Sequence, residues 1–377
     1  VYKRQALYRA MNAAEIHWDT VDPNSNIVLE INSGEWEVDG NPALNISGLN
    51  SGRLENSGWL ILKGNSLSDT RLTFSDIAAR GFYGKDVNRL HVCNLHLTRA
   101  QETVTQGTVV GYLHGAVWAD DTDPLTFGDQ PLLKIGRLDE SGTSSRFLVV
   151  ELHDGFPRIS DVDTHHFRQG RYTKRWRYTH SGIPYPVPGD EQQAWEQFQQ
   201  LGNGRWVLGM RRDPGYEIGD TLAIKSKLAG EPIFIAGGDS VIVENVLLTR
   251  ASRMLFRKGV DNILYRNVSI ARHSKVGGKT PFLASAEGGA QVGQPNEGPL
   301  RNVVVEQMLT HGTGDDPLAA FDVLGLQVRN SSFHDSFARG ILLDRTSDKP
   351  CINNTLVNRS PLLSLNTQFS WGCVEAS

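Results

Sequence analysis

The chain has 377 residues, with 38 Lys or Arg against 42 Asp or Glu, so its formal net charge is −4 and its pI is near 6.3. This balance excludes a basic surface for nucleic acid or an anionic bilayer, and no apolar run approaches the roughly 18 residues of a membrane span. The three cysteines, Cys93, Cys351 and Cys373, lack any metal-ligand spacing. We therefore expect no metal site built on them.

Residues 8–106 are expected to begin a repetitive β structure. Alternating apolar residues predict strands over 27–36 and 59–64, and a fuller unit over 82–97. The chain opens Val1-Tyr-Lys-Arg-Gln5, without a methionine or signal peptide. We expect these first residues to be foreign to the native chain and its N-terminus to be truncated, so the missing signal peptide does not fix a location.

Residues 107–225 differ in character and are expected to form an inserted small β-barrel or sandwich. Short strands are predicted at 108–113, 132–135, 147–152, 206–210 and 221–225, with one short helix over 190–200. A basic run surrounds Trp176 and Tyr178. It fits a sugar- or anion-binding lip, although a solvated basic strand is the favoured interpretation. Its members are Arg168, Arg171, Lys174, Arg175 and Arg177.

Residues 226–377 carry a repeated motif resembling V-x-V-x-N, as in Val241-Ile-Val-Glu-Asn245. Apolar residues two and four positions before the amide show the period of a strand. From Asn245 the amide residue recurs after 22, 40, 23 and 24 residues. A strand and an Asn turn in about two dozen residues is typical of one rung of a parallel β-helix. Stacked Asn side chains would then form a hydrogen-bonded ladder, and an earlier copy ends at Asn94.

The residue before each amide changes sign from one copy to the next. Glu244, Arg266, Glu306 and Arg329 occupy this outward-facing position. Rungs stack about 4.8 Å apart, so opposite charges would be neighbours. The alternation supports the alignment of the copies.

One copy is followed by His311-Gly-Thr-Gly-Asp-Asp316, the candidate catalytic segment. Two adjacent carboxylates share one surface only where the chain bends, which the neighbouring glycines and Pro317 allow. Acids held close together cannot both ionise easily, and glycoside hydrolysis needs one protonated acid and one carboxylate. Asp315 and Asp316 are therefore the catalytic candidates. The alternatives are a structural turn pair and a calcium site that uses backbone oxygens.

Further candidates follow from counting along the repeat. Glu287, on a long excursion from Arg272 to Leu300, is the third catalytic carboxylate, expected on a rung next to the acid pair. The remaining positions are expected to bind substrate. Arg339 aligns with Asp316 one rung later, Arg253 aligns with Asp315, Asp322 stacks with Arg345, and His311 is a donor; no metal ligand is assigned.

These motifs resemble the right-handed parallel β-helix carbohydrate-active proteins. Gly312-Thr-Gly-Asp-Asp316 resembles the Asp-Asp rung of polygalacturonase-type inverting glycosidases, and the layout is similar to bacterial α-1,3-galactosidases. The closer match rests on Thr105–Val110, Gly219–Ala223 and Arg339–Leu343. An Asp-Gly is usual where this chain has Glu287-Gly288. The polygalacturonase Gly-His-Gly and Arg-x-Lys signatures are missing after Asp316, which argues against galacturonan as the substrate.

The resemblance implies an all-β fold in three parts. These are the N-terminal part of a right-handed parallel β-helix (8–106), an inserted β-barrel-like domain (107–225) and the continued β-helix with the candidate active site (226–377). It also implies a secreted, periplasmic or cell-surface protein that acts on an oligosaccharide or polysaccharide. No cofactor is implied, with calcium kept as an alternative.

Three hypotheses for the function remain open at this stage. The first is an inverting, exo-acting glycosidase that acts on non-reducing ends and is α-galactosidase-like, with Asp315 and Asp316 as acid and base. The second is a polysaccharide lyase on the same fold, using Arg339, Arg253 or Lys275 as the base, with calcium at the acids. The third is a non-catalytic glycan-binding surface solenoid. A fold alone does not choose among them.

Overall fold

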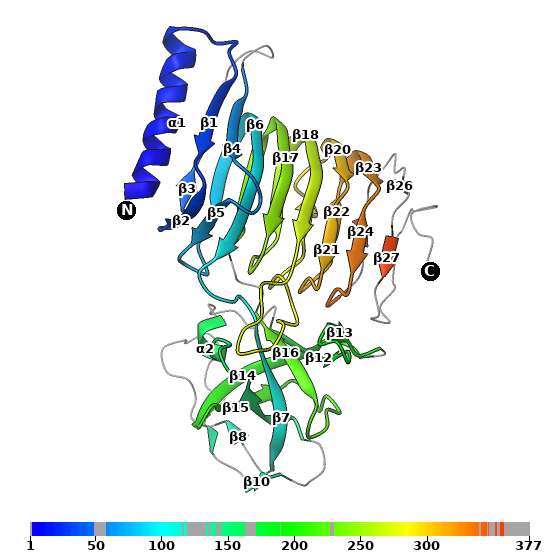
Figure 1. The fold of residues 1–377 in the computed structure, drawn as a ribbon. Helices are drawn as coiled ribbons and strands as arrows, with labels where there is room; N and C mark the ends of the chain where they lie inside the picture. Colours follow the sequence, from blue (N-terminus) through cyan, green and yellow to red (C-terminus); the bar gives the residue numbers. More distant parts are fainter. Residues whose placement is uncertain are drawn as a thin grey trace.

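The computed structural model describes residues 2–48, 58–114, 117–118, 133–134, 137–140, 145–162, 171–188, 190–226, 230–338, 341–344, 346, 351–352 and 355–357. Most of the described elements are strands, and they form a large parallel sheet, a smaller antiparallel sheet and a separate pair of short strands (Figure 1). None of the helices in the described part is long and apolar enough to span a membrane.

The parallel sheet is a coil with three strand positions per turn, here called rows A, B and C. The strands β6 (Phe82–Arg99), β17 (Ile233–Leu248) and β18 (Met254–Ile270) are long and bend through all three rows. Row A also holds β3 (Leu44–Asn45), β19 (Ala290–Val292), β22 (Leu318–Phe321) and β25 (Ile341–Asp344). Row B adds β1 (Ile27–Ile31), β4 (Leu60–Gly64), β20 (Leu300–Glu306), β23 (Val323–Arg329) and β26 (Cys351–Ile352). Row C adds β2 (Gly34–Val38), β5 (Thr70–Phe74), β21 (Leu309–His311), β24 (Ser332–His334) and β27 (Thr355–Val357).

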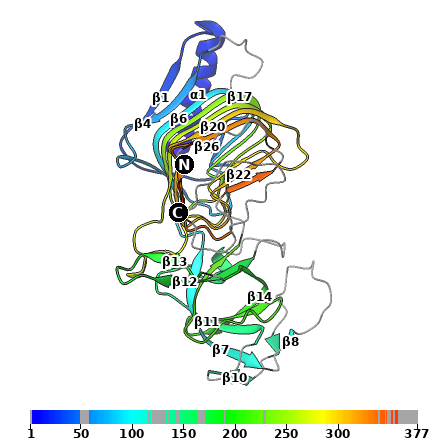
Figure 2. The ribbon, with the colours of Figure 1, turned by 90° about the vertical axis from the view of Figure 1, so that its right-hand side faces the viewer.

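Every pairing within the rows is parallel and joins one turn of the coil to the next. The view along the coil shows the turns superimposed around one core (Figure 2). In row B, four apolar residues pair in register from turn to turn and are almost wholly buried: Val241, Ile263, Val303 and Leu326. The predicted parallel β-helix is therefore confirmed.

An Asn ladder turns the chain between rows B and C. Asn94, Asn245 and Asn267 all have positive φ, a region that Asn tolerates better than most residues. Asn245 donates from Nδ2 to Asn94 Oδ1 at 2.6 Å, and Asn267 donates to Asn245 Oδ1 at 2.9 Å. Gln307 and Asn330 continue the line with φ of 55° and 51°. The predicted ladder is confirmed for its first three members.

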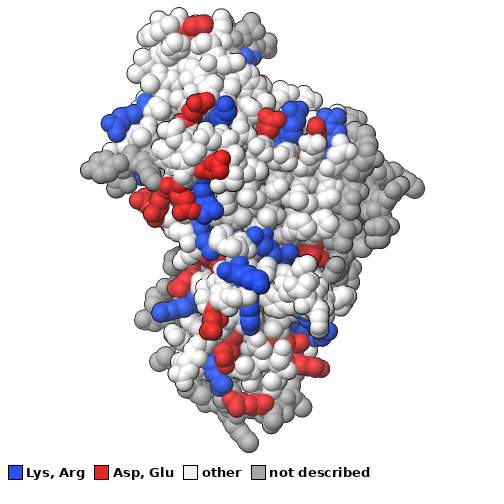
Figure 3. Space-filling view, in the orientation of Figure 1, with Lys and Arg blue, Asp and Glu red and all other residues white. Residues whose placement is uncertain are grey.

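The predicted alternation of charge along row B is also confirmed. Arg266 lies between Glu244, at 3.2 Å, and Glu306, at 3.9 Å, and Arg329 pairs with Glu306 at 2.7 Å. Acidic and basic side chains alternate across β17, β18, β20 and β23 in Figure 3. These pairs are exposed or half-buried, so each adds little stability.

Helix α1 (Tyr2–Thr20) packs against the first turn of the coil and was not predicted. Its residues Leu7, Met11, Ala14 and Trp18 are buried in the solenoid core. Their spacing of four, three and four residues is that of one helix face. The signal was in the sequence, but the strand assignment began only at residue 27.

The antiparallel sheet lies between β6 and β17 in the sequence and closes into a ring, here called the barrel. The ring order is β7 (Thr105–His114), β11 (Phe147–Leu152), β15 (Arg205–Met210), β14 (Gln193–Gly202), β12 (Tyr172–Tyr178) and β16 (Thr221–Lys225), which pairs back to β7. Strand β10 (Arg137–Asp139) extends β7, and β13 (Pro184–Pro186) extends β12. A separate pair, β8 (Val117–Trp118) and β9 (Leu133–Lys134), and the short α2 (Ile159–Val162) complete the region.

The predicted helix over 190–200 is wrong, because most of that segment is strand β14. Its Gln- and Glu-rich composition favours a helix locally. Pairing with β12 and β15 closes the ring, however, and buries Trp195 and Phe198 in the barrel core. This tertiary packing overrides the local preference.

The barrel joins the solenoid at one corner of the coil. The chain leaves row C at Arg99, forms the barrel, and returns to row A at Ile233. In the following turns the same corner, between rows C and A, is formed by residues 249–253, 271–289 and 312–317. The barrel therefore meets the solenoid where the predicted catalytic residues lie.

Candidate active site

Backbone register places the three candidate carboxylates on adjacent turns of this corner. Parallel bridges join Ala251 to Ser285 and Ser285 to Thr313, and the amide of Ala290 donates to the carbonyl of Pro317 at 3.0 Å. Counting between these fixed points puts Glu287 beside Asp315. The long excursion thus returns to the corner in register with the acid pair.

Glycine makes this close stacking feasible. A Cβ on Gly288 would overlap the carbonyl of Asp316, and a Cβ on Gly314 would overlap the backbone of Ser285 and Ala286. Neither position has room for any larger residue without a shift of the backbone. The two Gly-containing segments therefore let one turn lie directly on the next.

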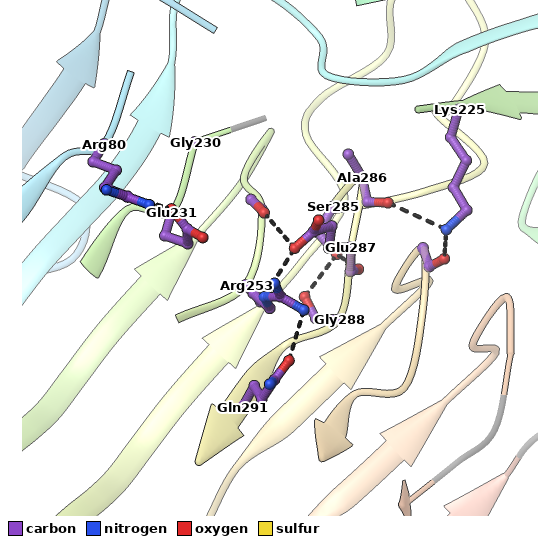
Figure 4. Close-up of polar contacts among 12 residues, drawn as sticks. Arg80, Lys225, Gly230, Glu231, Arg253, Ser285, Ala286, Glu287, Gly288 and Gln291 are labelled. Atoms are coloured by element: carbon purple, nitrogen blue, oxygen red, sulfur yellow. Dashed lines mark hydrogen bonds and ion pairs between the residues drawn. The ribbon is translucent and has the colours of Figure 1, made fainter. Parts of the chain in front are cut away.

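Glu287 is held in one position by side chains of the preceding turn. It is 5% exposed, its Oε2 lies 3.0 Å from Arg253 Nε, and it accepts a hydrogen bond from Ser252 Oγ at 3.1 Å. Arg253 also donates from Nη1 to Gln291 Oε1 at 2.6 Å (Figure 4). A guanidinium and a hydroxyl donor both favour the charged form of a carboxylate. Arg253 is thus engaged with Glu287.

Asp315 and Asp316 occupy the bend that the sequence predicted. Gly312 has a φ of 73°, and Thr313 Oγ1 donates to the carbonyl of Asp315 at 2.8 Å. Asp315 is half-buried, whereas Asp316 is only 6% exposed. The two residues therefore differ in their exposure to water.

His311 lies at the end of row C, just before this bend. Its ring stacks on that of His334 with centroids 4.5 Å apart and 14° between the planes. Burial, with smaller effects of His334 and Arg272, lowers the pKa of His311 to about 4. At neutral pH His311 is therefore an uncharged imidazole with one N–H to donate.

The remaining predicted binding residues are not all brought to the corner. Asp322 lies beyond the far end of β22, at a φ of 51°, where its Oδ2 accepts a hydrogen bond from the Asn296 amide at 3.3 Å. The four residues of β22 separate it from Asp316 by about 13 Å of strand. Arg339 and Arg345 lie outside the described residues.

Two buried lysines of the barrel reach this corner, and the sequence interpretation missed their role. The favoured interpretation of a solvated basic strand is wrong for Arg171 and Lys174, which are 5% and 0% exposed. Lys174 Nζ donates to the carbonyl of Phe337 at 2.9 Å, and burial lowers its pKa to about 8. Lys225, also 0% exposed, donates to the carbonyl of Gly314. A lysine that ends the apolar strand 221–225 was the signal available in the sequence.

Among the described residues, no group of three or more His, Cys, Asp or Glu side chains could hold a metal ion. Calcium coordination by backbone oxygens is a different arrangement, which this side-chain criterion does not address.

No family model and no curated protein matches the chain. Among solved structures, the A-module of a mannuronan C-5 epimerase from Azotobacter vinelandii aligns with a TM-score of 0.32 and 11% identity, covering 95% of this chain and 74% of its own. A protein described as a glycoside hydrolase aligns with a TM-score of 0.26 and 8% identity, covering 96% and 93%.

A bacteriophage tailspike, from phage AP22 of Acinetobacter baumannii and in complex with capsular saccharide, aligns at 0.17 and 8% identity. That alignment covers 92% of this chain but 55% of the tailspike chain. At TM-scores this low, these likenesses carry no argument about activity.

Proposed function

We propose that this chain is a glycoside hydrolase that removes sugars from the non-reducing ends of glycans by an inverting mechanism. The observation that supports this most is the gathering of Glu287, Asp315 and Asp316 on adjacent turns of one corner. Glycoside hydrolysis requires carboxyl groups in two protonation states. A carboxylate paired with arginine beside a pair of unequally buried aspartates fits that requirement.

The roles within the site follow from the surroundings of each group. Glu287, paired with Arg253 and Ser252, is suited to remain ionised, so it would orient water or support the developing positive charge on the sugar. Asp315 and Asp316 would then act as acid and base, in an order left open. Neutral His311 would donate a hydrogen bond to a sugar hydroxyl.

The barrel supports the exo-acting part of this proposal. It joins the solenoid at the corner that carries the acids, so it would block one direction of a long polymer. Because Arg253 is already paired with Glu287, it is poorly placed to bind a substrate carboxylate. We therefore propose a neutral sugar, with α-galactosides tested first.

The test is hydrolysis of aryl α- and β-glycosides and of intact oligosaccharides by the wild type and by Asp315→Asn and Asp316→Asn. Each substitution should lower turnover by at least about a hundredfold, the usual contribution of one acid or base group. Both variants should unfold at the wild-type temperature, because the replacement is nearly isosteric. Activity that survives both changes would remove the proposal.

The same assay separates the alternatives. Products that absorb as unsaturated uronates would indicate a lyase, and binding without turnover would indicate a glycan-binding solenoid. Proton NMR of the first product shows whether the anomeric configuration is inverted. We propose that no metal takes part, so turnover should be unchanged after EDTA treatment; a loss restored by calcium would contradict this.

A further inference from the structure

Lys225 brings a buried cation from the barrel to the acid-bearing corner. It lies at the end of β16, and its Nζ donates to the carbonyl of Gly314 and, at 3.4 Å, to that of Ala286 (Figure 4). Gly314 immediately precedes Asp315, and Ala286 immediately precedes Glu287. One ammonium group therefore bridges two adjacent turns at the residues next to two of the three carboxylates.

The groups that surround Lys225 are partners that an ammonium group can use. Its Nζ lies 4.7 Å from the ring centroid of Phe337 and 5.5 Å from that of Tyr172, both within the range of a cation–π contact. Carbonyl oxygens accept hydrogen bonds from an ammonium group, and the faces of aromatic rings attract its charge. The side chain is 0% exposed, so an ammonium charge here would be poorly screened by solvent.

Packing alone does not explain a lysine here. Burying an ammonium costs free energy unless every donor finds a partner. Methionine has nearly the same length and would fill the space without that cost. What methionine lacks is the link between the two turns and the positive charge beside the acids.

A second set of contacts fixes the same excursion from the barrel side. The ring of Phe282 stacks on that of Trp176 at 5.8 Å, and the Phe282 amide donates to Gln106 Oε1 at 2.9 Å. Gln106 in turn donates to the hydroxyl of Tyr178 at 2.8 Å. The segment that leads to Glu287 is thus attached to the barrel at Phe282 and again at Ala286.

We propose that Lys225 is a positioning residue of the active site, which sets the spacing of the Glu287 and Asp315 turns and favours ionised carboxylate there. The barrel is then part of the catalytic machinery. This inference rests on the proposed hydrolase activity. It differs from that proposal because Lys225 acts through the two turns and does not touch the substrate.

The test compares Lys225→Met with Lys174→Met, the matched loss of a second fully buried barrel lysine, whose acceptor Phe337 lies on the following turn and is not next to a candidate acid in the sequence. Lys225→Met should lower kcat by about ten- to a hundredfold, with KM within about threefold of wild type. The acidic limb of its pH–rate profile should move to higher pH, since the lost cation favoured the ionised base. Lys174→Met should keep kcat within about threefold and leave the pH limbs in place.

Folding and activity are controlled separately. Thermal unfolding of each variant shows whether it is folded; if Lys225→Met is not, Lys225→Gln takes its place. A folded Lys225 variant with wild-type kcat and an unmoved acidic limb overturns the inference, as does an equal loss in Lys174→Met. If the wild type hydrolyses no substrate, the proposed hydrolase function fails. If Asp316→Asn is inactive while the Lys225 variant keeps wild-type activity, the hydrolase proposal stands and only the role of Lys225 fails.

Discussion

His96 is an outward-facing side chain that is buried and yet has polar partners on both ring nitrogens. His96 projects from row C but is 5% exposed. Arg71 Nε donates to its Nδ1 at 3.2 Å, so its Nε2 carries the proton that is shared with Thr249 Oγ1 at 2.8 Å. The neutral ring satisfies both neighbours. Burial, assisted by Arg71, lowers the pKa of His96 to about 4.

A stability prediction follows from this pKa. In the unfolded chain His96 binds a proton near pH 6.5, whereas in the folded chain it does so only near pH 4, so acid favours unfolding over that range. As the pH falls from 6.5 to 5, protonation of His96 in the unfolded chain should lower the free energy of unfolding by about 2 kcal/mol. His96→Gln should remove that share of the pH dependence in urea titrations. Exposed His180→Gln serves as the control, and identical pH slopes in the two variants would contradict the prediction.

At the residue scale, the candidate acids were proposed from sequence alone, whereas the side chains around them were not predicted. Asp315 and Asp316 stood out because adjacent acids between glycines depart from the repeat. The pairing of Glu287 with Arg253 depends on the path of the long segment 271–289, and no local sequence pattern predicts that path. Lys225 was missed for the same reason, because its contacts with Gly314 and Ala286 span 89 and 61 residues.

At the scale of elements, the Asn ladder defines where each strand ends and the next begins. Asn245 is its central member, donating to Asn94 and accepting from Asn267. Asn203, in the hairpin between β14 and β15, has almost the same φ of 50° but is exposed and outside the ladder. Comparing Asn203 with Asn245 therefore separates the free-energy cost of a left-handed backbone from the stabilisation that the ladder hydrogen bonds provide.

Asn203→Ala should therefore lower the free energy of unfolding by about 1 kcal/mol, the cost of positive φ for alanine. Asn245→Ala should lower it by about 3 kcal/mol, because it also removes two side-chain hydrogen bonds, of which the one to Asn94 is partly buried. Denaturant unfolding of both variants measures the difference. Equal losses would mean that the ladder contributes nothing beyond its backbone conformation.

The repeated strands and several barrel strands were predicted accurately, whereas helix α1 was missed and strand β14 was predicted as a helix. A shift of one residue in register would expose the apolar side chains of every turn. A period of two and a recurring Asn therefore suffice to align β17, β18, β20 and β23. Strand β14 and helix α1 have no second copy to align. Their structure depends on the barrel ring and on the first solenoid turn, which override or complete the local pattern.

For the molecule as a whole, the contacts at the junction of the barrel and the solenoid are specific. Phe282 is 1% exposed and packs its ring on Trp176 and on Tyr178, whose centroid lies at 5.0 Å. Tyr178 also donates its hydroxyl to the carbonyl of Thr280 at 2.8 Å. The segment that carries Glu287 thus contacts the barrel as well as the solenoid.

Phe282→Ala should loosen this junction while leaving each body folded. The cavity should cost about 3 to 5 kcal/mol locally, so backbone amides of 272–289 and of β12 should exchange hydrogen faster while those of β20 keep their protection. Phe198→Ala, which opens a similar cavity inside the barrel core beside Trp195 and Trp206, is the matched control. It should speed exchange in β14 and β15 and leave 272–289 unchanged. Faster exchange of 272–289 in both variants would mean that the junction depends on overall barrel stability and not on the contacts of Phe282.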